Sequence, residues 1–429
     1  MSVDGPRGAL VRRVAADTRP LRHPAFRRLF VGQSVSMVGF QLTAVAVAVQ
    51  MYDITRSSLW VGLLGLAVLV PLVVFGLYGG SVSDAVDRRR LLVASSYVVW
   101  LSTGGLLAQA LAGLEDRWVL LSLVALQSVG FALSSPTRGA VIPRLLPWDL
   151  VPAANTLSST AINLGAVLGP LLAGLVLARG GYAVAYGIDA ALFTAGLYAA
   201  HRLPPLPPVG GKTRPGLRSV AEGLSFVATR PVLLMSFAVD IIAMVMALPR
   251  ALFPEVAEQR FNGPGSAGWL YASIALGAVT GGLLSGWIGR VSRQGLALVA
   301  AVVVWGLAVA AAGLVPSLWL VVALLALGGA ADLVSSVYRQ TILQTYAPDE
   351  MRGRMQGVFI VVVAGGPRLG DLRAGAAAES FGATASWVGG GLACVVLVIG
   401  LAVAVPSLVR YRMGDAAGQN RVDDRREAR

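Results

Sequence analysis

GGSVSDAVDRRR, residues 79–90, is the most informative segment of this sequence for predicting its fold. It begins with two glycines, ends with three arginines and is wedged between two long apolar runs, Leu59–Val82 and Leu91–Gly113. Each run is long enough to cross a bilayer, because roughly 20 apolar residues in a helix span ~30 Å of hydrocarbon. We therefore predict a tight turn at one face of a membrane, with positive charge left on that face.

The composition agrees with a membrane protein. The chain has 429 residues, of which 56% are hydrophobic and 13% are charged, and its mean hydropathy is +0.71. A soluble domain of this size carries about twice that share of charge, roughly 25%. Lipid forces backbone groups to pair within helices or closed barrels, and the short alternating segments of barrel strands are missing from this sequence. The predicted fold class is an all-α membrane protein whose first partner is the lipid bilayer.

Twelve apolar spans divide the chain into two sets of six. They are 28–52, 59–83, 91–113, 118–137, 151–178, 182–201, 232–253, 266–289, 295–314, 318–339, 355–378 and 385–409. The predicted domains are an N-terminal segment (1–27), a first six-helix half (28–201), a Pro/Gly-rich linker (202–231), a second six-helix half (232–409) and a C-terminal tail (410–429).

Arginine is distributed unequally between the alternate turns. The formal net charge is +13, but most of that charge lies in the turns on one side. The other side carries little beyond Arg56, Arg117, Arg179 and Arg260. Positive charge is enriched on the cytoplasmic face of membrane proteins, so we predict that both termini are cytoplasmic. We interpret the arginine-rich turns as residues that set the membrane orientation, not as a nucleic-acid binding site. Lys212 is the sole lysine, and this arginine bias is typical of a GC-rich bacterium, which favours a bacterial plasma membrane.

Several chemistries are disfavoured. Cys394 is the single cysteine and lies in an apolar run, and the two histidines, His23 and His201, lie at the edges of spans. We therefore expect no metal site and no cofactor, and any proton chemistry within the membrane must use carboxylates. Because the sequence shows no paired nucleophile and base and no metal cluster, we also expect that the protein is not an enzyme. Gly211-Lys212-Thr213 lacks the glycine spacing and the preceding strand of a phosphate loop, which argues against an ATP-driven pump.

The two halves share positions at nearly constant separation. Arg138, Pro147, Asp149 and Asn155 recur 201 residues later as Arg339, Pro348, Glu350 and Gln356. Gly80, Ser83 and Arg88 recur 202 residues later as Gly282, Ser285 and Arg290. Near-equal separations in two different turns indicate duplication, and parallel six-helix repeats with a site between them are a transporter architecture.

The opening segment resembles the loop between helices 2 and 3 of the major facilitator superfamily, Gly-x-x-x-Asp-Arg-x-Gly-Arg-Arg/Lys. The matching residues are Gly80, Asp84, Arg88 and Arg89, whereas Ala85 and Asp87 depart from the pattern. His23-Pro24-Ala25-Phe26-Arg27, Leu343-Gln344-Thr345, Pro348 and Gly353-Arg354 resemble the branch of siderophore (enterobactin) exporters and macrolide or multidrug efflux proteins.

This resemblance implies a cytoplasmic latch, in which Asp84 faces the N-terminus of span 11 and works with Arg88 to hold the halves together. The alternative is a solvated turn whose arginines only set the topology. Span 5 contains Gly165, Gly169, Pro170 and Gly174, which resemble part of the antiporter element of exporters, although Thr156 and Ala173 replace two of its glycines. The alternative for span 5 is close helix packing through small residues.

Charges inside spans are costly and are therefore functional or paired. The candidates for proton coupling or cavity charge are Asp240, Asp332, Arg339, Arg368 and Asp371. We expect Asp240 or Asp332 to titrate, with Arg339 or Arg368 as its partner; a static ion-pair network is the alternative. Asp189 is a weaker candidate, and Arg250 is expected to anchor the interface at the outer end of span 7. Trp60, Trp118, Trp269, Trp319 and Trp387 are expected to form an aromatic belt.

The sequence as a whole favours a secondary active transporter that works by alternating access. We expect it to export a siderophore-like or drug-like amphipathic small molecule with protons as the coupling ion. An importer or facilitator of the same fold is the first alternative. A receptor or lipid scramblase is the alternative from another class. A monomer suffices for this architecture, and the cargo cannot be read from these motifs because they lie in turns, away from it.

Overall fold

The computed structural model describes residues 17–207, 225, 227–346 and 352–411, without the side chains of 76–85, 136, 140, 346 and 352–361. Within these residues the chain is helical and contains no strand. The long helices of the first half are α2 (Pro24–Thr55), α3 (Ser58–Ala85), α4 (Arg88–Leu111), α5 (Arg117–Leu145) and α6 (Val151–His201). Those of the second half are α8 (Pro231–Ala247), α9 (Phe253–Phe261), α10 (Pro264–Leu283), α11 (Gln294–Leu314), α12 (Leu318–Tyr346), α13 (Arg352–Phe381) and α14 (Ala383–Ala404).

The helices account for twelve membrane crossings. Nine segments of the described chain are long and apolar enough to span a membrane. One of them holds two crossings, because α6 bends at Gly181, whose φ of 71° is a conformation that glycine adopts without steric cost. The two remaining crossings are α10 and α13. Glycines lower the mean hydropathy of α10, and α13 carries the charged residues Arg368, Asp371 and Arg373.

The helix ends follow from local chemistry. Asp116 caps α5 by accepting hydrogen bonds from the backbone N–H groups of Trp118 (2.7 Å) and Val119 (3.3 Å). Pro249 follows the end of α8, and a 3-10 turn (η3, Arg250–Leu252) then leads into α9. The predicted boundaries at 27, 201, 231 and 410 stay predictions, because 1–16, most of the linker and the tail after 411 lie outside the described residues.

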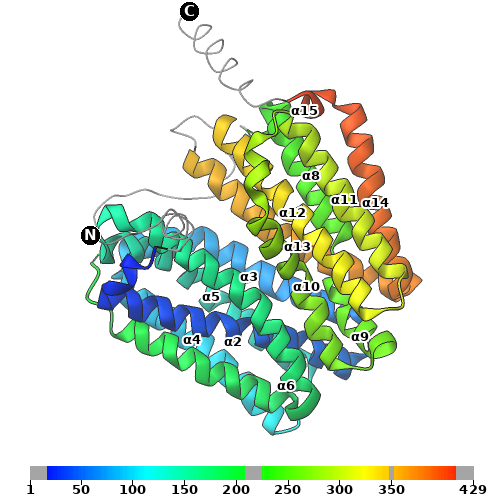
Figure 1. The fold of residues 1–429 in the computed structure, drawn as a ribbon. Coiled ribbons are helices and arrows are strands. Elements are labelled where there is room, and N and C mark those ends of the chain that lie inside the picture. The colour runs from blue at the N-terminus through cyan, green and yellow to red at the C-terminus, as the bar shows by residue number, and fades with distance from the viewer. Residues whose placement is uncertain (1–16, 208–224, 226, 347–351, 412–429) are drawn as a thin grey trace, which may run out of the picture.

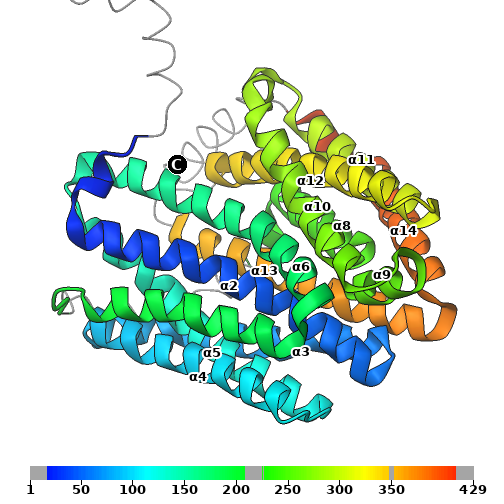
Figure 2. The same cartoon turned by 60° about the horizontal axis from the view of Figure 1, so that its bottom comes forward.

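Two helix bundles lie side by side (Figures 1 and 2). α2 to α6 form one bundle, and α8 to α14 form the other. The bundles meet mainly where α3 packs against α13 and where α6 packs against α10. We call the end of the molecule that holds the 79–90 turn the motif end, and the end that holds the α2–α3 turn the Arg56 end.

The bundles touch near the Arg56 end through glycines that allow backbones to approach closely. A Cβ added to Gly268 of α10 would lie 2.5 Å from the carbonyl oxygen of Pro170 in α6. A Cβ added to Gly375 of α13 would lie 2.3 Å from the carbonyl oxygen of Ser58 in α3. Such separations are far below van der Waals contact, so any larger residue at either position would push the bundles apart.

The tryptophans divide into two kinds. Trp60 and Trp118 meet edge to face with ring centroids 5.1 Å apart, and Trp269 meets Trp319 at 4.9 Å, on the Arg56 side of the molecule. The prediction is wrong for Trp387, which is buried and donates its indole N–H to the carbonyl oxygen of Val309 at 2.9 Å. Trp387 thus packs α14 on α11 and cannot serve an aromatic belt.

Candidate functional site

The 79–90 turn is docked on its own half. Gly80 and Asp84 belong to the end of α3, where side chains lie outside the described residues. Arg88 and Arg89 begin α4: the backbone N–H of Arg88 bonds the carbonyl oxygen of Leu206 at 3.1 Å, and the Arg89 guanidinium bonds that of His201 at 2.7 Å. These contacts tie the turn to the end of α6, and the latch across the two halves stays a prediction.

Asp87, which departs from the family pattern, has a structural role. Its Oδ1 accepts a hydrogen bond from the backbone N–H of Arg90 at 3.1 Å and so caps α4. Its Oδ2 accepts a hydrogen bond from the backbone N–H of Leu206 at 3.2 Å. One carboxylate therefore joins the start of α4 to the chain that follows α6.

Replacing Asp87 by Ala is expected to destabilise the fold by about 1 kcal/mol, because α4 loses its N-cap. The measurement is the midpoint of thermal unfolding in detergent. Asp87→Asn, which keeps one accepting oxygen for the cap, is the matched control and should unfold at a higher temperature than Asp87→Ala. An Asp87→Ala protein that unfolds together with the control would show that the cap does not contribute.

The predicted span 5 residues face two different neighbours. Gly165 and Gly169 pack on α2, where an added Cβ would lie 2.9 Å from a side-chain atom of Met37 and 2.4 Å from one of Gln41. Gly174 instead faces α10, because a Cβ there would lie 2.8 Å from the carbonyl oxygen of Gly265. These glycines thus allow α6 to pack closely on α2 of its own bundle and, further along the helix, on α10 of the other bundle.

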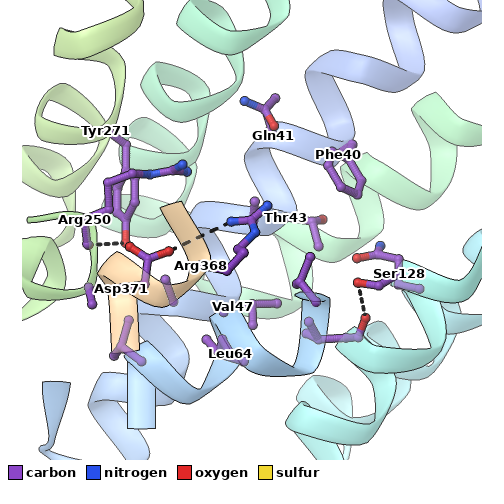
Figure 3. A pocket seen from close by; sticks show the side chains of 18 residues that line it. Phe40, Gln41, Thr43, Val47, Leu64, Ser128, Arg250, Tyr271, Arg368 and Asp371 are labelled. Atoms are coloured by element: carbon purple, nitrogen blue, oxygen red, sulfur yellow. Dashed lines mark hydrogen bonds and ion pairs between the residues drawn. The ribbon is translucent and has the colours of Figure 1, made fainter. Parts of the chain in front are cut away.

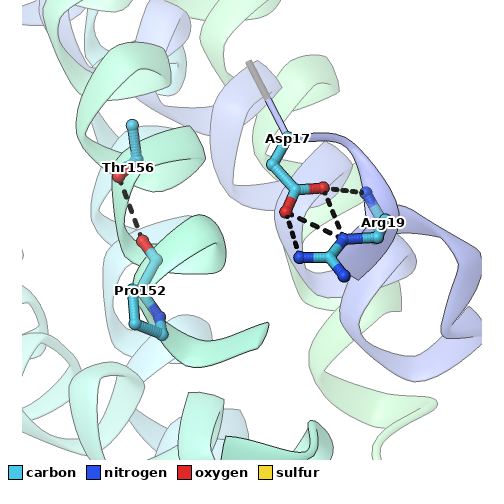
Figure 4. A network of polar contacts seen from close by, with 4 residues as sticks. All are labelled: Asp17, Arg19, Pro152 and Thr156. Carbon is cyan, nitrogen blue, oxygen red and sulfur yellow. Dashed lines mark hydrogen bonds and ion pairs between the residues drawn. The ribbon is translucent and has the colours of Figure 1, made fainter. Parts of the chain in front are cut away.

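Figure 4 shows a local contact of Thr156 in α6 and an ion pair that precedes α2. Thr156, which replaces a glycine of the exporter element, turns its hydroxyl back onto the carbonyl oxygen of Pro152 at 3.0 Å. Asp17 and Arg19 form an exposed pair at 2.7 Å, and the hydrogen bonds from Arg19 hold the pKa of Asp17 below its usual value. Exposed pairs of this kind contribute little to stability.

A buried ionic triad lies in the second half. Arg339 of α12 pairs with Asp240 of α8, and its Nη2 also lies 3.9 Å from Oδ1 of Asp332. The side chains of Arg339 and Asp240 are 6% and 3% exposed, whereas that of Asp332 is 33% exposed and lines a cavity. The guanidinium therefore sits between one enclosed carboxylate and one that reaches the space between the bundles.

A second charged cluster faces the space between the two bundles (Figure 3). Arg368 and Asp371, one turn apart on α13, lie 3.9 Å from each other. The Tyr271 hydroxyl donates to the carbonyl oxygen of Arg250 at 3.0 Å, and the Arg250 guanidinium lies 5.8 Å from the Tyr271 ring centre. Oδ1 of Asp371 is buried without a hydrogen-bond partner among the described residues.

The prediction that Arg250 anchors the membrane interface is therefore wrong. Arg250 lines the cavity together with Arg368 and Asp371. The reason is local, because Pro249 ends α8 and the following 3-10 turn carries the side chain inward. An arginine that directly follows a proline at the end of a span is a signal that could have indicated this.

Three adjoining cavities form the candidate binding site. Their volumes are ≈ 130, 290 and 300 Å³; Phe40 lines both the first and the second, and Gln41 and Arg250 line both the first and the third. The second cavity continues past Gln33 and Arg138 toward the motif end. Joined cavities of this size fall in the range that holds a drug-sized molecule, and their walls are mostly apolar with a few convergent polar groups.

The Arg56 end is closed by polar contacts between the bundles. Arg56 pairs with Glu258 of α9, and the Ser58 hydroxyl donates to Glu255. The Ser57 hydroxyl donates to Glu379 of α13 at 2.7 Å. Together with the glycine contacts between α6 and α10, these bonds close the molecule at the Arg56 end, whereas the second cavity extends toward the motif end.

Comparison with known proteins identifies a matching protein family. The family model of the transmembrane secretion effectors matches residues 15–426. The enterobactin exporters EntS of Shigella boydii serotype 18 and of Escherichia coli O139:H28 are each 31% identical over 396 residues, which covers 91% of this chain and 94% of theirs.

Solved transporters share the fold. The nucleoside transporter NupG has a TM-score of 0.71 at 12% identity, with 90% of this chain and 100% of that chain covered. A D-xylose–proton symporter has a TM-score of 0.70 at 13% identity, with coverage of 91% and 100%. A bacterial homolog of the human lysosomal transporter Spinster, in an inward-facing conformation, has a TM-score of 0.67 at 16% identity, with 91% of this chain and 97% of that chain covered. These likenesses confirm the predicted fold class.

Proposed function

Because this chain belongs to the transmembrane secretion effector family of the major facilitator superfamily, we propose that it is a proton-coupled exporter of an amphipathic small molecule of the siderophore or drug type. The chain is a membrane transporter and not an enzyme, as the sequence predicted. The relatives that are 31% identical to it are enterobactin exporters, which supports export.

The observation that carries this proposal is the cavity between the bundles. Its walls are largely apolar, and in the first of its three parts the charged side chains of Arg250, Arg368 and Asp371 lie around Tyr271. An amphipathic cargo can lay its apolar surface on Phe40 and its oxygen atoms on the guanidinium groups. A small, fully polar cargo such as a sugar would leave most of these walls without a partner.

The two ends of the molecule have different roles. The motif end faces the cytoplasm, because the turns at that end carry most of the arginine residues. With the Arg56 end closed and the cavities extending the other way, the molecule is in the state that loads cargo from the cytoplasm. In the opposite state, the latch formed by Gly80, Asp84, Arg88 and Arg89 holds the motif end closed.

The ionic triad supplies the coupling. Arg339 is shared between Asp240 and Asp332, so a proton on either carboxylate weakens one side of the triad. Asp332 reaches the cavity and is the one that meets protons from solvent. Arg368 and Asp371 form the matching pair on α13 and compete with the polar groups of the cargo.

The test uses inside-out membrane vesicles that carry the full chain, with enterobactin and ethidium as the probes. An acidic vesicle interior should drive accumulation of at least one probe without ATP, and nigericin should abolish it. Vesicles without the protein are the control. Accumulation that requires ATP, movement only out of the vesicles, or lipid exchange without probe transport would each overturn the proposal.

Asp240→Asn and Asp332→Asn are each expected to lower gradient-driven accumulation about tenfold or more, because an amide cannot take up the coupling proton; a typical coupling free energy of about 1–3 kcal/mol corresponds to roughly 5- to 150-fold. Exchange of the probe without a gradient should continue, because the cavity keeps its shape. The initial rates of the two processes are compared in the same vesicles. Gradient-driven transport that stays at the wild-type rate in both variants would exclude the triad as the coupling site.

A further inference from the structure

A buried carboxylate in the first half is not explained by the sites above. Asp189, in the part of α6 that follows Gly181, is 1% exposed. Its Oδ2 accepts hydrogen bonds from the hydroxyls of Thr43 at 2.7 Å and Thr103 at 3.3 Å. Its Oδ1 is buried without a hydrogen-bond partner among the described residues.

Among the described residues, the groups that face Asp189 carry no charge. From α2 it is faced by Gly39 and Thr43, and a Cβ added to Gly39 would lie 2.3 Å from Oδ1. From α4 it is faced by Thr103, and on its own helix Tyr186 gives its hydroxyl hydrogen to Gln50 at 2.6 Å. A carboxylate ion without a cation is costly in such surroundings, whereas a protonated carboxyl group is not.

Two hydrogen-bonded paths join Asp189 to the cavity. Thr43 lines the cavity beside Phe40 (Figure 3), and its hydroxyl donates directly to Asp189. Gln127 of α5 also lines the cavity, and its amide nitrogen donates to the Thr103 hydroxyl at 3.0 Å. The two paths come from different helices and end on the same oxygen of Asp189.

We propose that Asp189 is a proton-binding site of the first half that exchanges protons with the cavity through the Thr43 hydroxyl. The hydroxyl oxygen takes a proton from cavity water while its own hydrogen passes to Asp189 Oδ2, so the threonine ends neutral and the carboxylate becomes a carboxyl group. Release follows the same steps in reverse.

Coupling to cargo follows from the position of α2, and this part of the inference rests on the proposed proton-driven export. Phe40, Gln41 and Thr43 lie on the wall that cargo would contact, so a cargo that shifts α2 also moves the group bonded to Asp189. The triad around Arg339 differs in kind, because its carboxylates already have a cation. The two halves thus hold a neutralised carboxyl site and an ion-paired site.

The first experiment needs no cargo. The infrared difference spectrum of the full chain in liposomes, recorded between alkaline and acidic pH, should contain the carbonyl stretch of a protonated carboxylic acid. Asp189→Asn should remove part of that band, whereas Glu115→Gln, which replaces an exposed carboxyl group, should leave the buried-acid component in place. Equal spectra for the wild type and Asp189→Asn would overturn the proposal.

Proton transfer to Asp189 through the Thr43 hydroxyl is tested with a separate variant. Thr43→Val should keep the Asp189 band but slow its shift after transfer into deuterated buffer, because the relaying hydroxyl is gone. An unchanged rate would overturn the route through Thr43. Asp189→Glu, which can still bind a proton, should keep a carboxylic acid band, and its thermal unfolding shows whether the site tolerates substitution at all.

Transport by the same vesicles separates this inference from the proposed function. If wild-type vesicles accumulate enterobactin or ethidium, Asp189→Asn should lose accumulation driven by the gradient and keep probe exchange without one. Full gradient-driven accumulation by Asp189→Asn would overturn the coupling role. Failure of the wild type to transport either probe would count against the proposed function alone, because the infrared band still reports the proton site.

Discussion

Replacement of Arg339 by Gln is expected to destabilise the protein by about 3–5 kcal/mol, the cost of breaking a buried ion pair on one side. The side chain of Asp240 is 3% exposed and would keep its charge without the guanidinium that now compensates it. Asp332 is one-third exposed and can turn toward the cavity, so Asp240 carries most of the effect. This is the largest change in stability that we expect from one substitution.

The measurement is thermal unfolding of the full chain in detergent, together with the yield of folded protein. The double variant Asp240→Asn with Arg339→Gln should recover most of the loss, because a neutral pair replaces an uncompensated charge. Arg179→Gln, at an exposed position, is the matched control and should unfold with the wild type. A double variant no more stable than Arg339→Gln would contradict the pairing seen here.

Gly268→Val is expected to open the Arg56 end without unfolding either bundle. A Cβ at Gly268 would lie 2.5 Å from the carbonyl oxygen of Pro170 and 2.9 Å from the Cα of Gly174, both on the facing helix α6. Overpacking of this kind costs about 1–3 kcal/mol, which corresponds to roughly a 5- to 150-fold shift between two states. The strain disappears when the bundles separate, so the population moves toward the state that is open at the Arg56 end.

Cross-linking by a bifunctional thiol reagent reports this shift. Arg56→Cys with Glu258→Cys, in a background with Cys394→Ala, places one thiol on each bundle at the pair that closes the Arg56 end, and the reagent bridges the gap that the two shorter side chains leave. The cross-link should form readily with Gly268 in place and at least about tenfold more slowly with Gly268→Val. Gly389→Val is the matched control, because a Cβ at Gly389 meets no atom within 4 Å. Equal cross-linking in the two backgrounds would show that this glycine contact does not hold the end closed.

Residue patterns predicted part of the candidate site. Asp240 and Arg339 were recognisable because charge inside an apolar span must be paired or functional. Arg250 was misplaced, because it stands at the end of its span, where interface anchors are common, and only the inward turn after Pro249 shows otherwise. Asp189 ranked low for a similar reason, since nothing along the chain distinguishes a carboxylate that faces a cation from one that faces two hydroxyls.

The number of crossings, the two halves and the face that carries the arginines could all be predicted from the sequence. These properties depend on local runs of apolar and charged residues, each of which partitions between lipid and water largely independently of the others. The partners of the buried charges became known from the packing of the helices: Asp240 pairs with Arg339, which lies 99 residues away in the sequence, and Asp189 bonds Thr43, which lies 146 residues away. Helical periodicity assigns a side chain to a face of its helix, but the partner on that face depends on how two helices cross, and the glycines at the crossings set that distance.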